Sequence, residues 1–306
     1  MKPQLRLATV LLALTLSIPA GTRAATPQTD FPTAGAAVDA LIAAVQTKDK
    51  TSFRALMGPG SEHLLSSGDK IADATAARDF LANYALHHQL LQQGDDKAVL
   101  IVGTDDWPMP IPVVRANGRW HFDARTGAQE IIDRRIGRNE IAAIRTSLAF
   151  VDAEEAYHER LGSYATRLVS SAGKYDGLYW DTSKDEPTSP LGPLVAQAIE
   201  EGYPGATAAG KHLPYQGYFF RVLKGQGASA SGGRQSYLAG GAMTGGYALI
   251  AWPAVYGSSG VVSFQVNQAG VVFQKDLGPN TAKLAAGINL FDPDLSWARV
   301  DITTTP

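Results

Sequence analysis

Apolar residues recur every three or four positions in three stretches of the first hundred residues, which is the spacing of an amphipathic helix. This pattern predicts helices over residues 31–45, 49–57 and 74–92. The apolar set of the third stretch is Phe80, Leu81, Tyr84, Leu90 and Leu91.

The period then changes to two, which is typical of strands. Strands are expected over residues 98–103, 111–114 and 120–122, and Asn117-Gly118 between the last two is a strong signal for a tight hairpin. Helices followed by a meander predict a small α+β domain over residues 25–130. The layout resembles the cone-shaped NTF2-like fold, with fewer strands than a full cone.

Residues 130–161 contain no proline and one glycine, Gly137, and they predict one long helix. Its start is charged from Asp133 to Arg138, so an apolar stripe farther along must dock on a sheet. The expected stripe contains Ile141, Ile144, Leu148 and Val151, continued by Phe150, Ala153, Tyr157 and Leu161.

The chain is turn-rich from residue 162 to residue 215, apart from a short helix expected over 191–201. Period-two segments follow at 218–223, 237–238, 247–252, 261–266 and 271–274, and residues 267–270 join the last two as a tight hairpin. We therefore predict a second domain over residues 131–301, with the long helix packed on a glycine-rich antiparallel meander. Residues 302–306 are expected to form a disordered tail. The overall class is α+β.

The first 24 residues have the order of a secretory signal peptide. Lys2 and Arg6 precede an apolar stretch that ends near Pro19, and Ala24 closes the segment with a small residue two positions before it. The stretch is short for a bilayer-spanning helix, although an uncleaved anchor is the alternative. We expect cleavage after Ala24 and a mature protein located in the periplasm or outside the cell.

Composition removes several classes of function. The chain has no cysteine, which rules out disulfides, thiolate metal sites and a cysteine nucleophile. The net charge is −2, and residues 203–306 carry only 7 basic and 4 acidic side chains, so no nucleic-acid-binding stripe is expected. No second long apolar segment follows the first, and no transmembrane helix is expected in the mature chain.

Two parts of the sequence resemble a type IV pilin headgroup. The helix from Asn139 to Tyr157 resembles the second half of the pilin helix, and residues 260–270 resemble the last hairpin of the headgroup. Asp133, Arg134 and Arg135 stand where pilins have an apolar anchoring half. The resemblance therefore implies the headgroup fold without fibre assembly.

The whole mature chain resembles a narrower group, the secreted bacterial family known as domain of unknown function 2950. The resemblance rests on Ser66-Ser67-Gly68-Asp69, residues 175–180, 189–194, 217–221 and 251–254, and Lys275-Asp276-Leu277-Gly278-Pro279. It implies export and one chain-long unit, and it supplies no activity and no functional residue.

Patterns that carry catalysis are weak in this chain. Ser67/Lys70 and Ser171/Lys174 both match Ser-x-x-Lys, at chance frequency and without the accompanying motifs of penicillin-binding enzymes. The six histidines contain no pair at i, i+4 spacing, and phosphate-binding glycine loops are missing. We expect no catalytic residue, no metal and no cofactor.

Two acidic loops admit a binding role beside a structural one. Asp181, Asp185 and Glu186 can hold Ca²⁺ or form a solvated acidic loop. Asp105 and Asp106 beside Trp107-Pro108 can line a carbohydrate site or form an exposed turn. The structural interpretation is preferred for both loops.

Aromatic residues are dense in the turn-rich connection, and they supply the candidate ligand or partner groove. These aromatic residues and the neighbouring Asp181 either seal the seam between helix and sheet, which is the preferred interpretation, or line this groove: Tyr175, Tyr179, Trp180, Asp181, Tyr203 and Tyr215. We expect an exported, non-enzymatic protein that binds an envelope protein or takes part in assembly. The alternative is a periplasmic hydrolase or small-molecule-binding protein with its pocket in residues 30–130 or 175–215.

Overall fold

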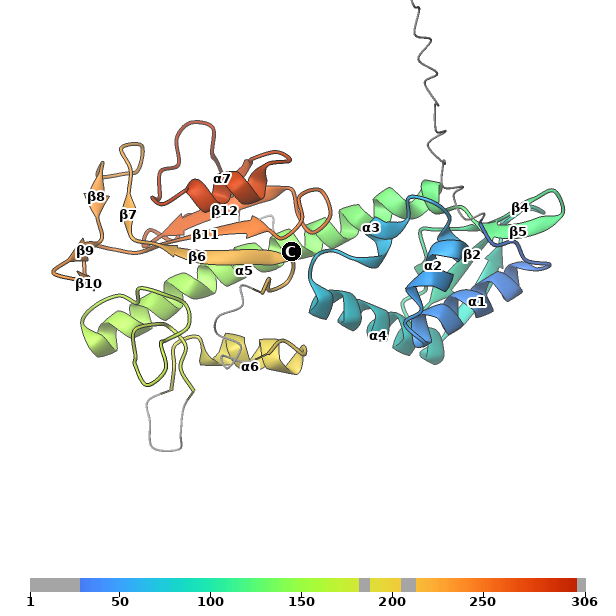
Figure 1. The fold of residues 1–306 in the computed structure, drawn as a ribbon, viewed down its shortest axis with the longest axis horizontal. Coiled ribbons are helices and arrows are strands. Elements are labelled where there is room, and N and C mark those ends of the chain that lie inside the picture. Colours follow the sequence, from blue (N-terminus) through green and yellow to red (C-terminus); the bar gives the residue numbers. More distant parts are fainter. Residues whose placement is uncertain (1–27, 182–187, 205–212, 302–306) are drawn as a thin grey trace, which may run out of the picture.

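The computed structural model describes residues 28–181, 188–204 and 213–301 (Figure 1). The expected signal peptide at 1–24, the tail at 302–306 and the acidic pair Asp185 and Glu186 lie outside these residues. The described chain forms an N-terminal unit and a C-terminal sheet unit, and the long helix α5 (Ala124–Leu161) runs through both. The α+β class is confirmed.

The N-terminal unit packs short helices on an antiparallel sheet with the strand order β1-β2-β4-β5 and with β3 beside β2. Asn117 and Gly118, both at positive φ, turn β4 into β5 as the sequence predicts. Its elements are α1 (Ala34–Gln46), α2 (Lys50–Met57), α3 (Glu62–Leu65), α4 (Lys70–Leu86), β1 (His88–Gln92), β2 (Lys97–Val102), β3 (Trp107–Pro108), β4 (Val113–Ala116) and β5 (Arg119–Phe122).

The helix expected over residues 74–92 is wrong at its C-terminal end. α4 ends at Leu86, and residues 88–92 form β1, which pairs with β2 along its length. His87 is extended at the junction, and its carbonyl accepts a hydrogen bond of 2.9 Å from the N–H of Gly103. Leu90 and Leu91 therefore lie on a strand at the edge of the sheet and not on the face of a helix.

α5 begins seven residues before residue 131, the expected start of the second domain. Its first turns belong to the N-terminal unit, because a Cβ at Gly127 would lie 2.1 Å from the carbonyl oxygen of Pro110. Farther along, α5 packs on β11 and β12 of the second sheet. Half of the expected stripe is buried, namely Ile144, Phe150, Ala153 and Tyr157, whereas Ile141, Leu148, Val151 and Leu161 are not. The buried stripe also includes polar residues, among them Ser147 and Glu154.

The C-terminal sheet is antiparallel with the order β14-β13-β12-β11-β6, so β6 is an edge strand. Figure 1 shows α5 and α7 on opposite sides of its strands. Gly270 at positive φ closes the predicted hairpin between β12 and β13. The elements of this unit are α6 (Gly192–Glu200), β6 (Tyr218–Leu223), β7 (Gly225–Gln226), β8 (Gln235–Ser236), β9 (Leu238–Ala239), β10 (Ala242–Met243), β11 (Ala248–Pro253), β12 (Val262–Asn267), β13 (Phe273–Asp276), α7 (Thr281–Gly287) and β14 (Ala298–Arg299).

One buried carboxylate joins the two units. Asp69 caps α4 by accepting from the N–H groups of Ile71 and Ala72 through Oδ1. Its Oδ2 accepts from the hydroxyl of Tyr203 at 2.7 Å and from the N–H of Gly217 at 3.0 Å. Because both partners belong to the C-terminal unit, this side chain helps to hold α4 against it, as does the hydrogen bond of 3.2 Å from the hydroxyl of Thr75 on α4 to the carbonyl of Glu201.

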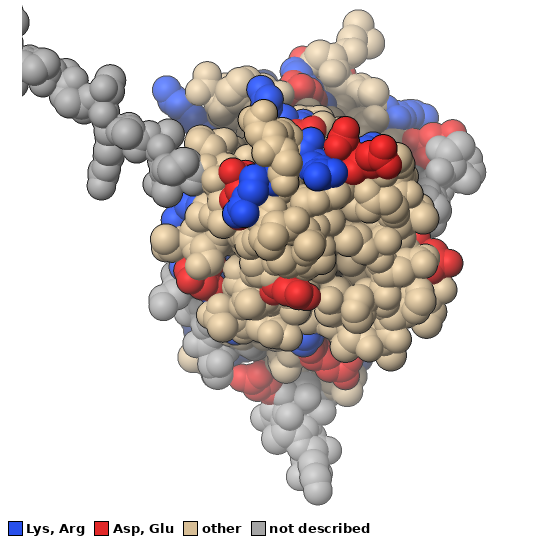
Figure 2. All heavy atoms as spheres, turned by 90° about the vertical axis from the view of Figure 1, so that its right-hand side faces the viewer, with Lys and Arg blue, Asp and Glu red and all other residues tan. Residues whose placement is uncertain are grey.

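The outer face of the N-terminal unit has mixed charge. Figure 2 shows basic and acidic side chains interspersed along its upper margin, and a broad area below it that carries only a few charged side chains, most of them acidic. This distribution agrees with the absence of a basic stripe in the sequence. Among the described residues, no helix is long and apolar enough to cross a membrane.

Candidate functional site

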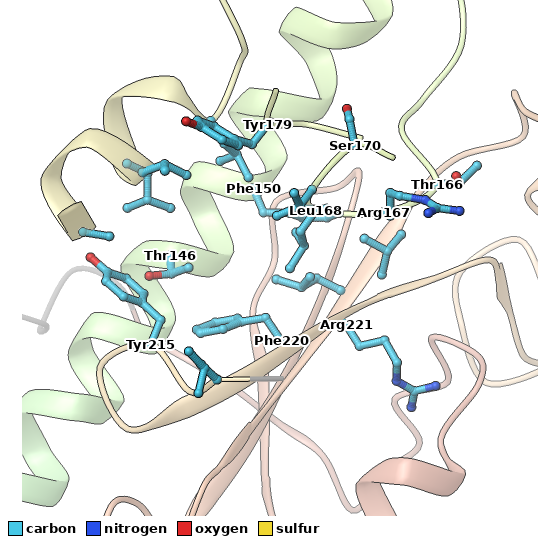
Figure 3. Close-up of a pocket in the computed structure, with 18 of the residues that line it drawn as sticks. Thr146, Phe150, Thr166, Arg167, Leu168, Ser170, Tyr179, Tyr215, Phe220 and Arg221 are labelled. Carbon is cyan, nitrogen blue, oxygen red and sulfur yellow. The ribbon is translucent and has the colours of Figure 1, made fainter. Parts of the chain in front are cut away.

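A cavity of about 1120 Å³ lies between α5, α6 and the edge strand β6 (Figure 3). Segment 166–172 and residues 213–215 complete its walls. Its volume is slightly above the ~300–1,000 Å³ that small-molecule pockets usually have. Most of the lining is apolar or aromatic: Phe150, Leu168, Val169, Tyr179, Leu191, Leu194, Val195, Ala198, Tyr203, Pro204, Leu213, Pro214, Tyr215, Phe220, Val222 and Leu249.

Helix α6 presents its apolar face to the cavity. Leu194, Val195 and Ala198 lie at i, i+1 and i+4 on the helix, so they share one side of it. The helix follows Leu191, whose N–H donates to the carbonyl of Leu178 at 3.0 Å, and Pro193 stands in its first turn. The short helix expected over residues 191–201 is therefore present, and its apolar face forms one wall of the cavity.

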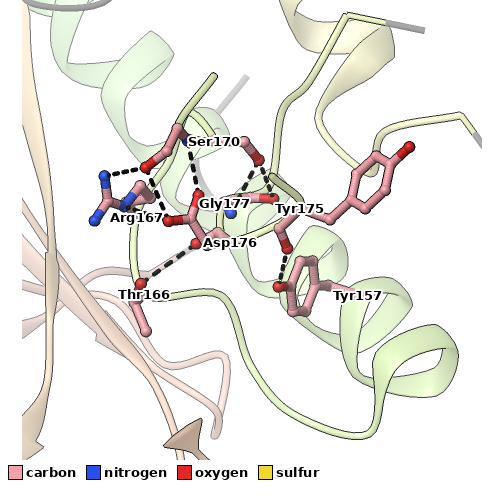
Figure 4. A network of polar contacts seen from close by, with 8 residues as sticks. Tyr157, Thr166, Arg167, Ser170, Tyr175, Asp176 and Gly177 are labelled. Atoms are coloured by element: carbon pink, nitrogen blue, oxygen red, sulfur yellow. Dashed lines mark hydrogen bonds and ion pairs between the residues drawn. The ribbon is translucent and has the colours of Figure 1, made fainter. Parts of the chain in front are cut away.

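A polar network holds segment 166–172 in place on the opposite wall (Figure 4). Asp176 accepts from the N–H and the hydroxyl of Ser171 at 2.7 and 2.9 Å and pairs with Arg167 at 3.6 Å. Burial acts to raise the pKa of Asp176, but the hydrogen bonds from Ser171 and the charge of Arg167 outweigh it and lower that pKa. Gly177 is required here, because a Cβ would lie 2.6 Å from the N–H nitrogen of Ser170.

The cavity borders the outer edge of β6. Tyr218 directs its backbone N–H and C=O away from β11, because both groups bond to Tyr215. In an antiparallel ladder this direction alternates, so the N–H and C=O of Phe220 and Val222 also point outward. The side chains of Phe220 and Val222 both line the cavity.

The aromatic candidates divide between the two expected roles. Tyr179, Tyr203 and Tyr215 line the cavity, whereas Tyr175, Trp180 and Asp181 do not. Trp180 is buried and packs edge-on against Tyr157 of α5 and against Tyr175. The hydroxyl of Tyr157 donates to the carbonyl of Tyr175 (Figure 4). Consecutive side chains in an extended segment point to opposite sides, so Tyr179 lines the groove whereas Trp180 packs into the seam between helix and sheet.

Asp181 does not line the groove, but it accepts a hydrogen bond from Tyr179, which does. It is exposed, and its carboxylate accepts from the hydroxyl of Tyr179 at 2.9 Å. Burial, followed by this hydrogen bond, raises the pKa of Tyr179. The proposed Ca²⁺ partners Asp185 and Glu186 lie outside the described residues, and within those residues no group of three His, Asp or Glu side chains has metal-binding geometry.

Two tyrosines at the α6 end of the cavity are weakly acidic. Burial, with the charge of Glu201, raises the pKa of Tyr215 to about 12. Burial also raises the pKa of Tyr203, and its hydrogen bond to Asp69 raises it further. Both hydroxyls are therefore neutral at physiological pH and act as hydrogen-bonding groups, not as bases.

All charged side chains among the lining residues are basic. Arg167, Arg221 and Lys224 line the cavity, and Figure 3 shows Arg167 and Arg221 on the side away from Tyr215. Arg221 donates to the carbonyls of Ala285 and Ile288 near α7, while Lys224 is exposed. None of the described lining residues is a carboxylate, an imidazole or a thiol. The lining thus offers apolar contact, positive charge and phenol hydroxyls.

The other sequence candidates occupy structural positions. The hydroxyl of Ser67 donates to Asp73 at 2.7 Å, and that of Ser171 donates to Asp176. Trp107 is partly exposed under the guanidinium of Arg134, 5.6 Å from its ring centre. A second, smaller cavity of about 370 Å³ lies between α1 and α2 in the N-terminal unit.

Sequence reasoning missed most of the cavity lining. The walls come mainly from residues 146–150, 166–172, 191–204 and 213–224, with Tyr179, Leu249 and Asn289, and only their packing brings these segments together. The signal available beforehand was the apolar face of α6 together with the aromatic residues of the connection.

Comparison with known proteins places the chain in a family. A family model described as a protein of unknown function (DUF2950) matches residues 28–300. The chain belongs to the DUF2950 family. The match covers both units, including Asp69 and the cavity walls, so these features lie within the family's domain. No curated protein and no solved structure matches the chain, and the resemblance to a pilin headgroup is not confirmed.

Proposed function

We propose that this DUF2950 protein is exported and acts as a non-enzymatic binding protein whose ligand occupies the cavity between α5, α6 and β6. The order of residues 1–24 supports export. The observation that carries the binding role is a cavity of about 1120 Å³ with a mainly apolar and aromatic lining. Its charged lining residues are basic, which favours a ligand with a negative group.

The proposal is tested with an apolar, anionic fluorescent probe, 1-anilinonaphthalene-8-sulfonate. The protein is expressed with its own N-terminal segment and purified in the form that the cell produces. We expect a saturable rise in probe fluorescence with one probe per chain. N-terminal sequencing of the same sample should begin at Ala25, and retention of Met1 would contradict cleavage.

Two substitutions on one helix provide the decisive comparison. Ala198 faces the cavity on α6 and Ala196 is exposed on the same helix. Ala198→Trp should weaken probe binding at least tenfold by filling the cavity, while Ala196→Trp should change it less than twofold. Equal binding by the two variants would show that the probe binds elsewhere and would refute the proposed site.

A further inference from the structure

The outer edge of β6 is covered at both ends and open in the middle. At one end the N–H of Tyr215 donates to the carbonyl of Tyr218 at 2.8 Å, and the reverse bond measures 3.0 Å. At the other end the N–H of Tyr237 donates to the carbonyl of Lys224 at 3.0 Å. Between them, the outward N–H and C=O groups of Phe220 and Val222 have no hydrogen-bond partner among the described residues.

This open stretch coincides with the cavity. The side chains of Phe220 and Val222 line it, and the facing wall is the segment Thr166–Ala172. Two backbone groups of that segment are already paired, because the carbonyl of Leu168 accepts from the N–H of Tyr179 at 2.9 Å and the N–H of Ser170 donates to the carbonyl of Tyr179 at 2.8 Å. The β6 side of the cavity therefore carries a row of backbone donors and acceptors without partners among the described residues.

These free groups discriminate between kinds of ligand. A ligand that excludes water from the edge leaves four backbone groups without partners unless it replaces their hydrogen bonds, and each buried, unsatisfied group costs about 1–3 kcal/mol. An acyl chain or an aromatic ring cannot replace them. An extended peptide can, because its N–H and C=O groups repeat with the spacing of the strand.

We propose, on the basis of the proposed function, that the ligand is an extended peptide segment of another protein, which adds as a strand to the edge of β6 at Phe220 and Val222. Tyr215 and Tyr237 limit the paired length to the few residues between them. Alternate side chains of the segment point into the apolar lining formed by Phe150 and α6. Arg167 and Lys224 favour an acidic residue in the segment.

The structure offers a backbone-specific variant with a matched control. Val222→Pro removes the outward N–H at an edge position, where proline is tolerated because that N–H makes no bond within the sheet. Val222→Ala shortens the same side chain and keeps the N–H. The difference between the two variants therefore reports the backbone hydrogen bond.

The probe peptide is acetyl-Val-Thr-Val-Thr-Val-Glu-amide, measured by displacement of 1-anilinonaphthalene-8-sulfonate from the cavity. Dodecanoate serves as the acyl-chain comparison. We expect the peptide to bind the Val222→Pro variant at least tenfold more weakly than the Val222→Ala variant. Binding of dodecanoate should differ less than threefold between the two variants.

Each other outcome has one meaning. Equal peptide affinity for Val222→Pro and Val222→Ala overturns the strand-addition proposal. Binding of dodecanoate without binding of the peptide overturns it as well and leaves the proposed function intact. Binding of neither ligand, together with no saturable probe signal, overturns both proposals.

A modified peptide covers the case in which Val222→Pro does not fold. The same probe peptide, methylated on every backbone nitrogen, keeps its side chains and loses its donors. Its affinity for the unaltered protein should be at least tenfold lower. Undiminished affinity of the methylated peptide contradicts pairing with β6.

Discussion

Glu154 is fully buried on α5, and its ionisation should make the stability of the protein depend on pH. Its Oε2 accepts from the N–H of Ala165 at 2.8 Å, and its Oε1 has no partner among the described residues. Burial raises the pKa of Glu154 to about 8 from 4.5, the hydrogen bond from Ala165 opposes this, and Glu155 adds to it. At neutral pH the carboxyl group is therefore mostly protonated in the folded protein.

The sign of the effect follows from proton binding. Between pH 4.5 and about 8 the folded state binds more protons at this residue than the unfolded state, so stability falls as the pH rises through this window. The contribution is fully present below pH 4.5 and is lost above about pH 8. At ~1.4 kcal/mol per pH unit, the whole window amounts to roughly 5 kcal/mol as an upper figure.

Glu154→Gln isolates this contribution, because the amide oxygen still accepts from Ala165 while the side chain no longer ionises. Urea unfolding followed by tryptophan fluorescence at pH 5, 6, 7 and 8.5 gives the free energy of unfolding of both proteins. We expect the variant to gain stability relative to the unaltered protein as the pH rises, by a few kcal/mol over the series. Glu159→Gln, an exposed change on the same helix, should show no such trend. A difference between Glu154→Gln and the unaltered protein that stays constant from pH 5 to 8.5 would refute the reasoning.

Two further substitutions test the junction between the units. Tyr203→Phe removes the hydroxyl that donates to Asp69 and accepts from the N–H of Gln216, and it should lower the free energy of unfolding by about 1–3 kcal/mol. The control is the exposed Tyr175→Phe, which should change the free energy of unfolding by less than about 0.5 kcal/mol. Equal effects of the two substitutions would contradict the role of Asp69. Gly68 has a positive φ, and a Cβ there would lie 2.5 Å from Cγ2 of Val255, whereas Gly60 has a positive φ and free space around it. We therefore expect Gly68→Ala to lower the free energy of unfolding by at least about 1 kcal/mol more than Gly60→Ala does. Calorimetric melting of the two glycine variants measures this difference, and matched melting temperatures would show that the contact is not tight.

The sequence predicted those helices and turns whose conformation is determined by residues nearby in the chain. The hairpin at Asn117-Gly118 and the long helix through residues 130–161 have strong local signals, and the structure confirms both. The strand at 88–92 was missed because its leucines continue the spacing of α4, and only pairing with β2 separates them.

The polar residues of the buried stripe on α5 show a second limit of prediction from the sequence. Ser147 and Glu154 are buried because they meet partners from other segments or from the helix itself, such as Ala165 and the carbonyl of Ala143. Periodicity of apolar residues cannot reveal such positions. The same holds for the cavity, where the aromatic connection pointed to Tyr179, Tyr203 and Tyr215 but contained no information about the open edge of β6.

Hydrogen exchange at the β6 edge tests the binding site most directly. In a sample labelled with ¹⁵N at phenylalanine and valine, the amides of Phe220 and Val222 point toward the cavity, whereas the amide of Phe219 points toward β11 and serves as an internal control. We predict that the Phe220 and Val222 amides exchange rapidly in the free protein and at least tenfold more slowly when the probe peptide saturates it, while Phe219 stays protected in both states. Unchanged exchange at Phe220 and Val222 in the saturated protein would contradict binding at this edge.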